Sequence, residues 1–261
     1  MSEHASTRRV SQDDVDDAPT EDAASTDQAT ADAPSEQATA DAPSTETTGA
    51  AAVVDALEAT GVETLFGIQG GAIMPVYDAL TGSSLRHVTM AHEQGAAHAA
   101  DAYGIVSGDP GVCMATSGPG ATNLVTGIAD ANMDSDPVVA LTGQVPTNFV
   151  GNDAFQETDT TGVTAPITKA NYFAGDADAV GDTVGEAFAL AETGRPGPTL
   201  VDLPKDVTQA TTAEREPTAE TPEHYDPQYD PDEDAVADAA RTLEDAERPL
   251  VLAGGGVIKG E

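Results

Sequence analysis

From Gly49 onward, short apolar runs alternate with longer segments in which apolar and polar residues are mixed. The short runs predict buried β-strands and the mixed segments predict helices. The predicted strands cover residues 64–68, 85–90, 111–117, 137–143 and 199–204. The predicted helices cover residues 51–61, 73–81, 93–108, 124–134 and 177–193. This alternation predicts an α/β fold, a parallel sheet flanked by helices on both faces, over residues 49–208.

The segments outside this pattern are polar or short. Residues 1–48 are rich in Ala, Asp, Thr, Ser and Glu, and we expect a disordered acidic tail because they cannot bury enough apolar surface to offset their ordering entropy. Residues 209–234 contain many acids and prolines and predict an acidic linker between domains. Residues 235–261 predict one helix followed by a strand at 248–256, too little for a core. We therefore expect the start of a further domain in a truncated chain.

The charge balance excludes one class of function and favours one environment. The chain carries 46 Asp and Glu against 10 Lys and Arg, a formal net charge of −36. Residues 1–48 hold 12 of these acids and 2 of the basic residues, so about −26 remains on the rest. Phosphate contacts need clustered basic residues, so the chain is not a nucleic-acid-binding protein. Because the acids are spread throughout rather than gathered in one interaction surface, they favour a halophilic protein in molar salt.

Two further features bear on location. No apolar run approaches the roughly 18 residues of a membrane span, and the first residues, MSEHASTRRV, contain no apolar signal region. The single cysteine, Cys113, cannot form an internal disulfide. We therefore expect a cytoplasmic protein without a membrane partner, in which Cys113 is an inert core residue.

Candidate chemistry gathers where predicted strands end. Four turns follow strands, at residues 69–72, 92–104, 116–123 and 143–157, and ligands of parallel sheets bind at the carboxyl ends of the strands. Taken singly, each turn has a simpler interpretation: a glycine pair after a strand is usually a turn, and a glutamate at a helix start usually stabilises the helix dipole. No carboxylate cluster has a clear metal-ligand spacing, so we predict no metal ligand in this chain.

In combination the motifs are more specific. They read FG-x-x-GGAIMPVYDAL at 66–80, HEQGAAHAADAYG at 92–104, ATSGPGATNLVTGIADA at 115–131, ALTGQVPT-x-x-x-G-x-DAFQE at 140–157 and GPTLVDLPKDV at 197–207. With them, residues 49–208 resemble the N-terminal, pyrimidine-binding domain of thiamine-diphosphate-dependent enzymes. The closest resemblance is to the catalytic subunit of the acetolactate synthase family. RPLVLAGGGV at 248–257 resembles the start of that family's middle domain.

The resemblance implies a role for several residues. Glu93 is the carboxylate that shares a proton with the aminopyrimidine ring and so promotes deprotonation of the cofactor; its small neighbours would favour partial desolvation. Residues implied to line the cofactor or face the reacting carbonyl are Gly70, Gly71, Thr116, Pro119, Asn123 and Gln156.

A second set is implied to shape the substrate channel: Pro146 and Phe155, with Arg248 near the entrance. The sequence departs from the family where Ile68 and Gln69 replace the Tyr-Pro pair that commonly precedes the two glycines. Ile68 offers no hydroxyl, so contacts at that position differ from the family's.

The resemblance also implies an activity. Such enzymes decarboxylate pyruvate and join the product to a second pyruvate or to 2-oxobutyrate, on the way to branched-chain amino acids. They use thiamine diphosphate with Mg²⁺ and FAD, and they assemble as homodimers or larger, often with a regulatory small subunit. The Gly-Asp-Gly…Asn motif that holds the Mg²⁺-diphosphate does not occur here, so we expect the 261-residue chain alone to be inactive. The alternatives are another thiamine-dependent 2-oxo acid decarboxylase or carboligase, and a non-catalytic pyrimidine domain that needs a partner chain.

Overall fold

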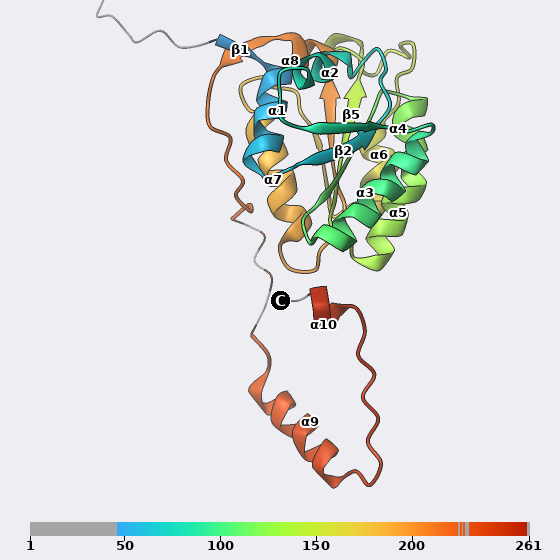
Figure 1. The fold of residues 1–261 in the computed structure, drawn as a ribbon, viewed down its shortest axis with the longest axis vertical. Coiled ribbons are helices and arrows are strands. Elements are labelled where there is room, and N and C mark those ends of the chain that lie inside the picture. The colour runs from blue at the N-terminus through green and yellow to red at the C-terminus, as the bar shows by residue number, and fades with distance from the viewer. Residues whose placement is uncertain (1–45, 224, 226, 228–229, 260–261) are drawn as a thin grey trace, which may run out of the picture. The chain divides into compact units, whose positions relative to one another are not determined.

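The computed structural model describes residues 46–223, 225, 227 and 230–259 of the chain (Figure 1). Most of the predicted acidic tail lies outside these residues. Its last three residues do not: they form a short strand, β1 (Glu46–Thr48), which pairs antiparallel with β8 (Thr211–Ala213). The folded domain therefore begins slightly before Gly49, and β8 ties the first part of the predicted linker to it.

The centre of the domain is a six-stranded sheet in which every pair is parallel, in the order β3-β2-β4-β5-β7-β6. The strands are β2 (Thr64–Gly67), β3 (Arg86–Thr89), β4 (Gly111–Ala115), β5 (Val138–Gln144), β6 (Ala170–Phe173) and β7 (Thr199–Pro204). The predicted parallel α/β fold is confirmed. The edge strand β6 was not predicted, because its four residues are only partly buried or exposed and form no apolar run.

Helices cover both faces of the sheet, as predicted (Figure 1). One face carries α1 (Gly49–Ala59), α2 (Met74–Leu80) and α7 (Val180–Glu192), and the other carries α3 (Glu93–Ser107) and α5 (Val125–Asp134). Side chains alternate between the faces along each strand, as β geometry requires. In β4, Met114 packs under α1 and α2, whereas Cys113 packs under α3 and α5.

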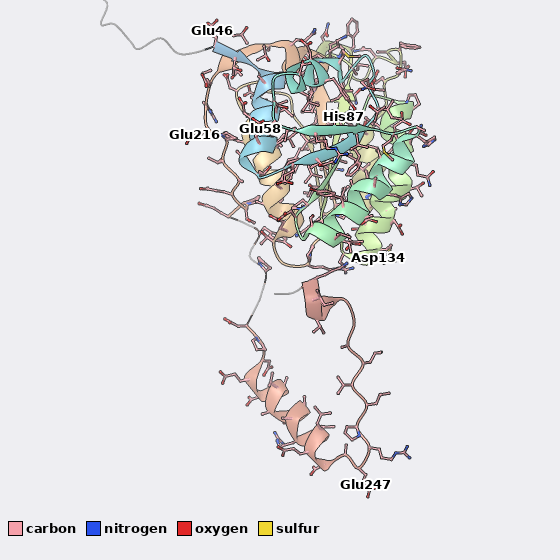
Figure 2. The ribbon with its side chains drawn as sticks, in the orientation of Figure 1. Glu46, Glu58, His87, Asp134, Glu216 and Glu247 are labelled. Carbon is pink, nitrogen blue, oxygen red and sulfur yellow. The ribbon has the colours of Figure 1, made fainter. Side chains whose placement is uncertain are left out.

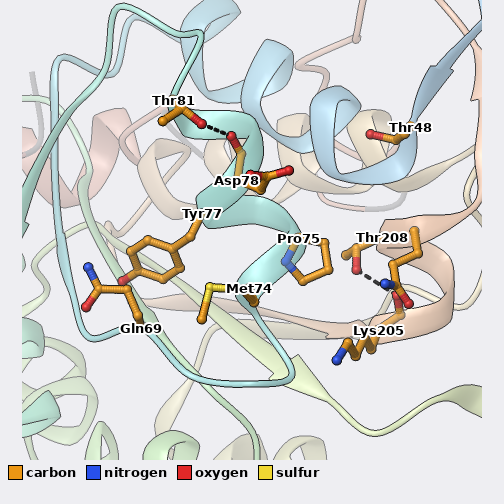
Figure 3. Close-up of a pocket in the computed structure, with 10 residues that line it drawn as sticks. Thr48, Gln69, Met74, Pro75, Tyr77, Asp78, Thr81, Lys205 and Thr208 are labelled. Atoms are coloured by element: carbon orange, nitrogen blue, oxygen red, sulfur yellow. Dashed lines mark hydrogen bonds between the residues drawn. The ribbon is translucent and has the colours of Figure 1, made fainter.

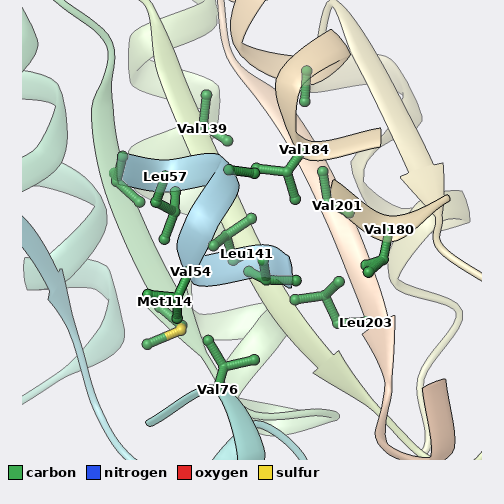
Figure 4. Close-up of a cluster of buried hydrophobic side chains, with 14 of the residues drawn as sticks. Val54, Leu57, Val76, Met114, Val139, Leu141, Val180, Val184, Val201 and Leu203 are labelled. Atoms are coloured by element: carbon green, nitrogen blue, oxygen red, sulfur yellow. The ribbon is translucent and has the colours of Figure 1, made fainter. Parts of the chain in front are cut away.

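Figure 4 shows the larger of these two cores, in which aliphatic side chains from α1, α2 and α7 meet those of β4, β5 and β7. On the other side of β4, Cys113 is fully buried, and burial raises the pKa of its thiol to about 12. The thiolate form is therefore disfavoured, and the prediction of an inert core cysteine is confirmed.

Short elements connect the main ones. The glycine-rich stretch predicted as a turn continues into a short helix, α4 (Pro119–Asn123), because proline is well suited to the first position of a helix. The polar loop after β5 contains η1 (Thr147–Phe149), α6 (Thr160–Thr164) and η2 (Ala165–Ile167), and α8 (Lys205–Gln209) follows β7 directly.

The C-terminal residues contain two further helices, α9 (Glu233–Asp245) and α10 (Gly256–Lys259). α9 corresponds to the helix predicted in this segment. The strand predicted at 248–256 is wrong. A strand needs a neighbour for its backbone hydrogen bonds, and no described strand pairs with this segment. Leu250 and Leu252 are 91% and 95% exposed, so their apolar side chains have no core to enter.

None of the helices in the described part of the chain has both the length and the apolar character that crossing a bilayer requires. Acidic side chains lie mainly on the outside of the domain, among them Glu58, Asp134 and Glu216 (Figure 2).

The sheet topology sets the place where a ligand can bind. The chain runs from β2 to β3 on one side and then crosses to β4 on the other side of β2. The loops that leave the carboxyl ends of β2 and β4 therefore diverge, and such a switch point opens a crevice at that edge of the sheet. The motifs singled out in the sequence lie in the loops at this edge.

Candidate functional site

Glu93 is placed by the start of α3. The preceding residue, His92, has an extended backbone, and its Nδ1 atom accepts a hydrogen bond of 3.1 Å from the backbone N–H of Gln94. This cap fixes the first turn of the helix, so Glu93 is its first residue. The backbone N–H groups of this turn favour a carboxylate there. Glu93 is half-buried, while Ala96 and Ala97 in the next turn are fully buried.

Asn123, at the end of α4, holds one oxygen of that carboxylate. Its Nδ2 donates a hydrogen bond of 3.0 Å to Oε2 of Glu93, across 30 residues of sequence. The other oxygen, Oε1, lies on the Gly120 side, 3.6 Å from where a Cβ on that glycine would be. Oε1 makes no hydrogen bond to a described residue. The site thus orients a carboxyl group and leaves one of its oxygens available.

Thr116 links the loops on the two sides of the switch point. Its hydroxyl accepts a hydrogen bond of 3.2 Å from the backbone N–H of Ala72, which follows the two glycines after β2. A Cβ on Gly70 would lie 2.4 Å from Cβ of Thr116, so only glycine permits this approach. Gly71, by contrast, is exposed, and no atom lies within 4 Å of a Cβ built on it. The backbone at Gly71 is therefore open to a ligand.

The loop after β5 is folded by Glu157. One of its carboxylate oxygens accepts the N–H of Gly151, and the other accepts the N–H of Ala154 at 2.8 Å. These backbone hydrogen bonds hold the pKa of Glu157 below its ordinary value. The loop they close carries Phe155 and Gln156, whose side chains are both exposed, Phe155 to 88%.

Gly118 is where this loop meets the turn after β4. Its φ is +60°, a conformation that favours glycine, and a Cβ there would lie 2.5 Å from the backbone oxygen of Gln156. Gln156 itself has a φ of +58°. The backbone of Gln156 is therefore packed against the glycine-rich turn, and its side chain is left free in the solvent.

A buried polar network anchors the same loop to the sheet. Asp202 of β7 is 1% exposed, and its two oxygens accept hydrogen bonds from Thr142 at 2.7 Å and from Gln144 at 2.8 Å. Gln144 also donates to the backbone oxygen of Thr158 at 2.8 Å. Burial raises the pKa of Asp202 to about 6, although hydrogen bonds from Thr142 and Gln144 oppose the rise.

A second contact joins the loop to α8. Asp206 accepts hydrogen bonds from the backbone N–H of Thr147 at 2.9 Å and from its hydroxyl at 2.5 Å. Burial alone would raise the pKa of Asp206, but these hydrogen bonds outweigh it and hold the pKa below its ordinary value. Sequence analysis missed Asp202, Asp206 and Gln144, because each acts through a partner about 60 residues away along the chain.

An open pocket of about 680 Å³ lies beside the β2–α2 loop, between α2 and α8 (Figure 3). Its lining includes Gln69 and Met74 from the loop and helix, Tyr77 and Asp78 from α2, and Lys205 at the start of α8. It does not include Glu93, so it adjoins the carboxylate site rather than containing it. Lys205, also missed by the sequence analysis, brings a cation to this pocket.

The structure brings together some of the residues proposed from the sequence. Glu93 contacts Asn123, and Thr116 packs on Gly70. The remaining proposed residues of the sheet edge lie around these contacts. Pro146 is half-buried in the loop after β5. The exposed ones are Gly71, Phe155, Gln156 and Pro119, which is the first residue of α4.

Two proposed positions stand apart from these contacts. Ile68 is half-buried, and its backbone N–H donates a hydrogen bond of 3.3 Å to the backbone oxygen of Met114. Arg248 is exposed after α9, and no hydrogen bond or ion pair joins it to another described residue.

Comparison with known proteins gives the fold and site a family. Residues 47–163 match the family described as thiamine pyrophosphate enzyme, N-terminal TPP binding domain. The chain is 53% identical over 214 residues to a protein named acetolactate synthase from Mycobacterium bovis. It is 52% identical over 215 residues to a probable acetolactate synthase large subunit from Methanocaldococcus jannaschii, and 49% identical over 213 residues to an acetolactate synthase large subunit from Corynebacterium glutamicum.

These alignments cover 80–81% of this chain but only 34–36% of each relative. The chain thus spans about a third of the length of the curated relatives it matches. The aligned part includes the α/β domain whose sheet edge holds Glu93, Asn123 and Thr116. The matched part of the α/β domain therefore carries the N-terminal TPP binding domain of thiamine pyrophosphate enzymes.

Proposed function

We propose that this chain supplies the pyrimidine-binding part of the active site of an acetolactate synthase large subunit. The observation that carries the proposal is the oriented carboxyl group of Glu93, held by Asn123 at the carboxyl edge of the sheet. The proposal is also supported by the family match over residues 47–163 and by relatives named acetolactate synthase that are 49–53% identical to this chain. The proposed reaction is the decarboxylation of pyruvate and transfer of the product to a second 2-oxo acid, pyruvate or 2-oxobutyrate.

The residues at the sheet edge fit thiamine diphosphate. An aminopyrimidine ring needs a carboxyl group beside a ring nitrogen, and Oε1 of Glu93 has no hydrogen-bond partner among the described residues. A flat ring also needs small neighbours, which Gly120 and the half-buried Thr116 provide. The open backbone at Gly71 leaves room for a substrate carbonyl group.

Once bound, thiamine diphosphate would supply an acidic carbon as the nucleophile toward a 2-oxo acid and a cationic ring that takes up the electrons left when CO₂ departs. The chain's part is to place and move a proton. Glu93 exchanges a proton with a ring nitrogen through Oε1, while Asn123 holds Oε2 and so fixes the direction of the carboxyl group. Buried Ala96 and Ala97 keep water from the inner side of that group, which strengthens its hydrogen bonds.

The other proposed residues surround this centre. Gly70 and Gly71 let backbone N–H groups approach the substrate carbonyl, and Pro119 bounds the ring pocket. Gln156 faces cofactor and substrate from the loop that Glu157 closes. Pro146 and Phe155, with Arg248 at the entrance, shape the channel. The exposed side chains of Phe155 and Gln156 are available for such contacts.

The remaining parts of the proposal concern partners and location. We propose that Mg²⁺ and the diphosphate are held by a domain of a second subunit, that FAD binds to a middle domain, and that the enzyme is at least a homodimer with a regulatory small subunit. The acidic composition supports a halophilic protein, and the single, buried cysteine is compatible with the cytoplasm.

A product assay tests the proposed reaction. The whole protein, supplied with pyruvate, thiamine diphosphate and Mg²⁺ in 2 M KCl, should form acetolactate, which acid converts to acetoin for detection. Release of acetaldehyde without acetolactate would replace the proposal by a thiamine-dependent decarboxylase. No consumption of pyruvate, with activity appearing only when a diphosphate-binding chain is added, would identify a pyrimidine-domain subunit instead.

A further inference from the structure

A second cluster of chemically active side chains lies on α3 and α5, away from the carboxyl group of Glu93. His98 and Asp101 are three residues apart on α3 and so share one face of that helix, and Asp130 reaches the same place from α5. Each offers one ligand atom, and the three atoms lie within 4.8 Å of one another. Nδ1 of His98 is 3.5 Å from Oδ2 of Asp130.

Asp101 is the unusual member of this cluster. It is only 8% exposed, and its Oδ1 atom is buried without a hydrogen-bond partner, the one such side-chain atom among the described residues. Buried polar atoms are normally satisfied, so an unpartnered one calls for a ligand or a proton. Asp202, which is also buried, shows the contrast: both of its oxygens accept hydrogen bonds from protein side chains.

The charges around Asp101 also call for a cation. Two other carboxyl groups lie close to that of Asp101: Asp136, to which a shared proton would hydrogen-bond it, and Asp130. Asp136 is 1% exposed and forms an ion pair with Lys259. No described lysine or arginine forms an ion pair with Asp101 or Asp130.

We propose that His98, Asp101 and Asp130 bind a divalent transition metal ion, with Zn²⁺ as the best fit. One imidazole nitrogen and two carboxylate oxygens form a ligand set that Zn²⁺ accepts, with bonds of about 2.0–2.2 Å and water completing the shell. Two tetrahedral ligands at that bond length are about 3.4 Å apart. The 3.5 Å between Nδ1 of His98 and Oδ2 of Asp130 is close to this separation.

The metal would join the two helices that carry the carboxylate site. α3 begins at Glu93, and α5 follows closely after α4, which ends at Asn123. A metal bridge between α3 and α5 therefore fixes the two elements that bring Glu93 and Asn123 together. The sequence analysis did not identify this site from residue spacing, because Asp130 lies 29 positions after Asp101 and on another helix.

A competition titration tests the site on the 261-residue chain. Zn²⁺ is shared between the protein and a chromophoric chelator in 2 M KCl, where weak binding to the many surface acids is screened. The expected result is one site per chain with a Kd of about 10 µM or tighter. His98→Gln and Asp130→Asn should each weaken that site at least tenfold. Asp134→Asn, which removes the same charge from the same helix outside the cluster, should leave it unchanged.

X-ray absorption at the zinc edge identifies the ligands independently of affinity. The wild-type chain should show one imidazole among oxygen ligands, and His98→Gln should lose it. Because Asp101 is buried, Asp101→Asn is used only if its circular dichroism matches the wild type. The proposal fails if no saturable site is found, if His98→Gln and Asp130→Asn bind Zn²⁺ as tightly as the wild type, or if the absorption spectrum contains no imidazole.

Discussion

At the scale of single residues, the domain uses buried and half-buried carboxyl groups in different ways. Glu93 keeps one oxygen bound and one available, which suits proton exchange with a ligand. Asp202 has both oxygens satisfied by Thr142 and Gln144, which suits an anchor for the loop after β5. The difference lies in the hydrogen-bond partners of each group, since all of them are carboxylic acids.

The raised pKa of Asp202 predicts how stability changes with pH. The folded state binds this proton with a pKa of about 6, above the ordinary value of 3.8 for the unfolded chain. The group therefore favours the folded state at acid pH, and that contribution is lost as the pH rises through 6. Between pH 5 and 7, the free energy of unfolding of the wild type should fall by about 1 kcal/mol relative to Asp202→Asn.

Urea unfolding of both proteins across this pH range, in high salt, provides the measurement. Asp78→Asn, which alters an exposed aspartate on α2, is the control and should follow the wild type. Parallel pH curves for the wild type and Asp202→Asn would contradict the account of a carboxyl group whose proton is held by burial.

At the scale of elements, the central strands and the edge strand β3 were predictable, whereas the other edge strand, β6, was not. β4, β5 and β7 are buried along their whole length, so each forms an apolar run in the sequence. β6 packs at an edge and shows no such run, whereas residues 250–252 form an apolar run but find no strand to pair with. Pairing depends on neighbours, and the local sequence does not state which neighbours are present.

The same distinction applies to the site. Sequence motifs placed Glu93 at the start of a predicted helix and Thr116 and Asn123 where a predicted strand ends, all at one edge of the sheet, because parallel strands end there. They did not show that Gln156 packs its backbone on Gly118. Nor did they show that Glu157 folds the loop, since both of those contacts require the three-dimensional arrangement of the loops.

The role of Glu157 gives a prediction for the loop after β5. In Glu157→Gln, one of the two hydrogen bonds from Gly151 and Ala154 is lost and the other loses its charge, so the loop should open more often. Amide hydrogen exchange over residues 150–157 should accelerate by roughly tenfold, with little change in the sheet. Asp153→Asn, an exposed aspartate of the same loop, is the matched control; equal exchange in both variants would show that Glu157 does not close the loop.

At the scale of the whole molecule, the surface charge dominates. The chain carries a net charge of −36, yet only four ion pairs occur among the described residues, one of them with a histidine. Most acidic side chains therefore face solvent without a cationic partner. Their mutual repulsion destabilises the compact state unless salt screens it, and at about 1 M salt the screening length is only about 3 Å.

This repulsion predicts folding that depends on salt. The melting temperature, followed by circular dichroism, should rise continuously between 0.1 M and 3 M KCl. Sucrose strengthens the burial of apolar surface but does not screen charge, so it serves as the control that separates these two effects. At 0.1 M KCl, added sucrose should raise the melting temperature less than added salt does. A melt that is the same at 0.1 M and 3 M KCl would contradict the screening account.

The central claim is that Glu93 exchanges a proton with the cofactor, and exchange of deuterium at C2 of bound thiamine diphosphate tests it most directly. In the whole protein, Glu93→Gln keeps the size of the side chain and a contact to Asn123 but removes the basic group. The exchange rate should then fall by about 10²–10⁴-fold, with cofactor binding only modestly weaker. If Glu93 only stabilises the start of α3, the variant loses about 0.3–1 kcal/mol of stability and exchanges C2 at the wild-type rate. That second result would contradict the account.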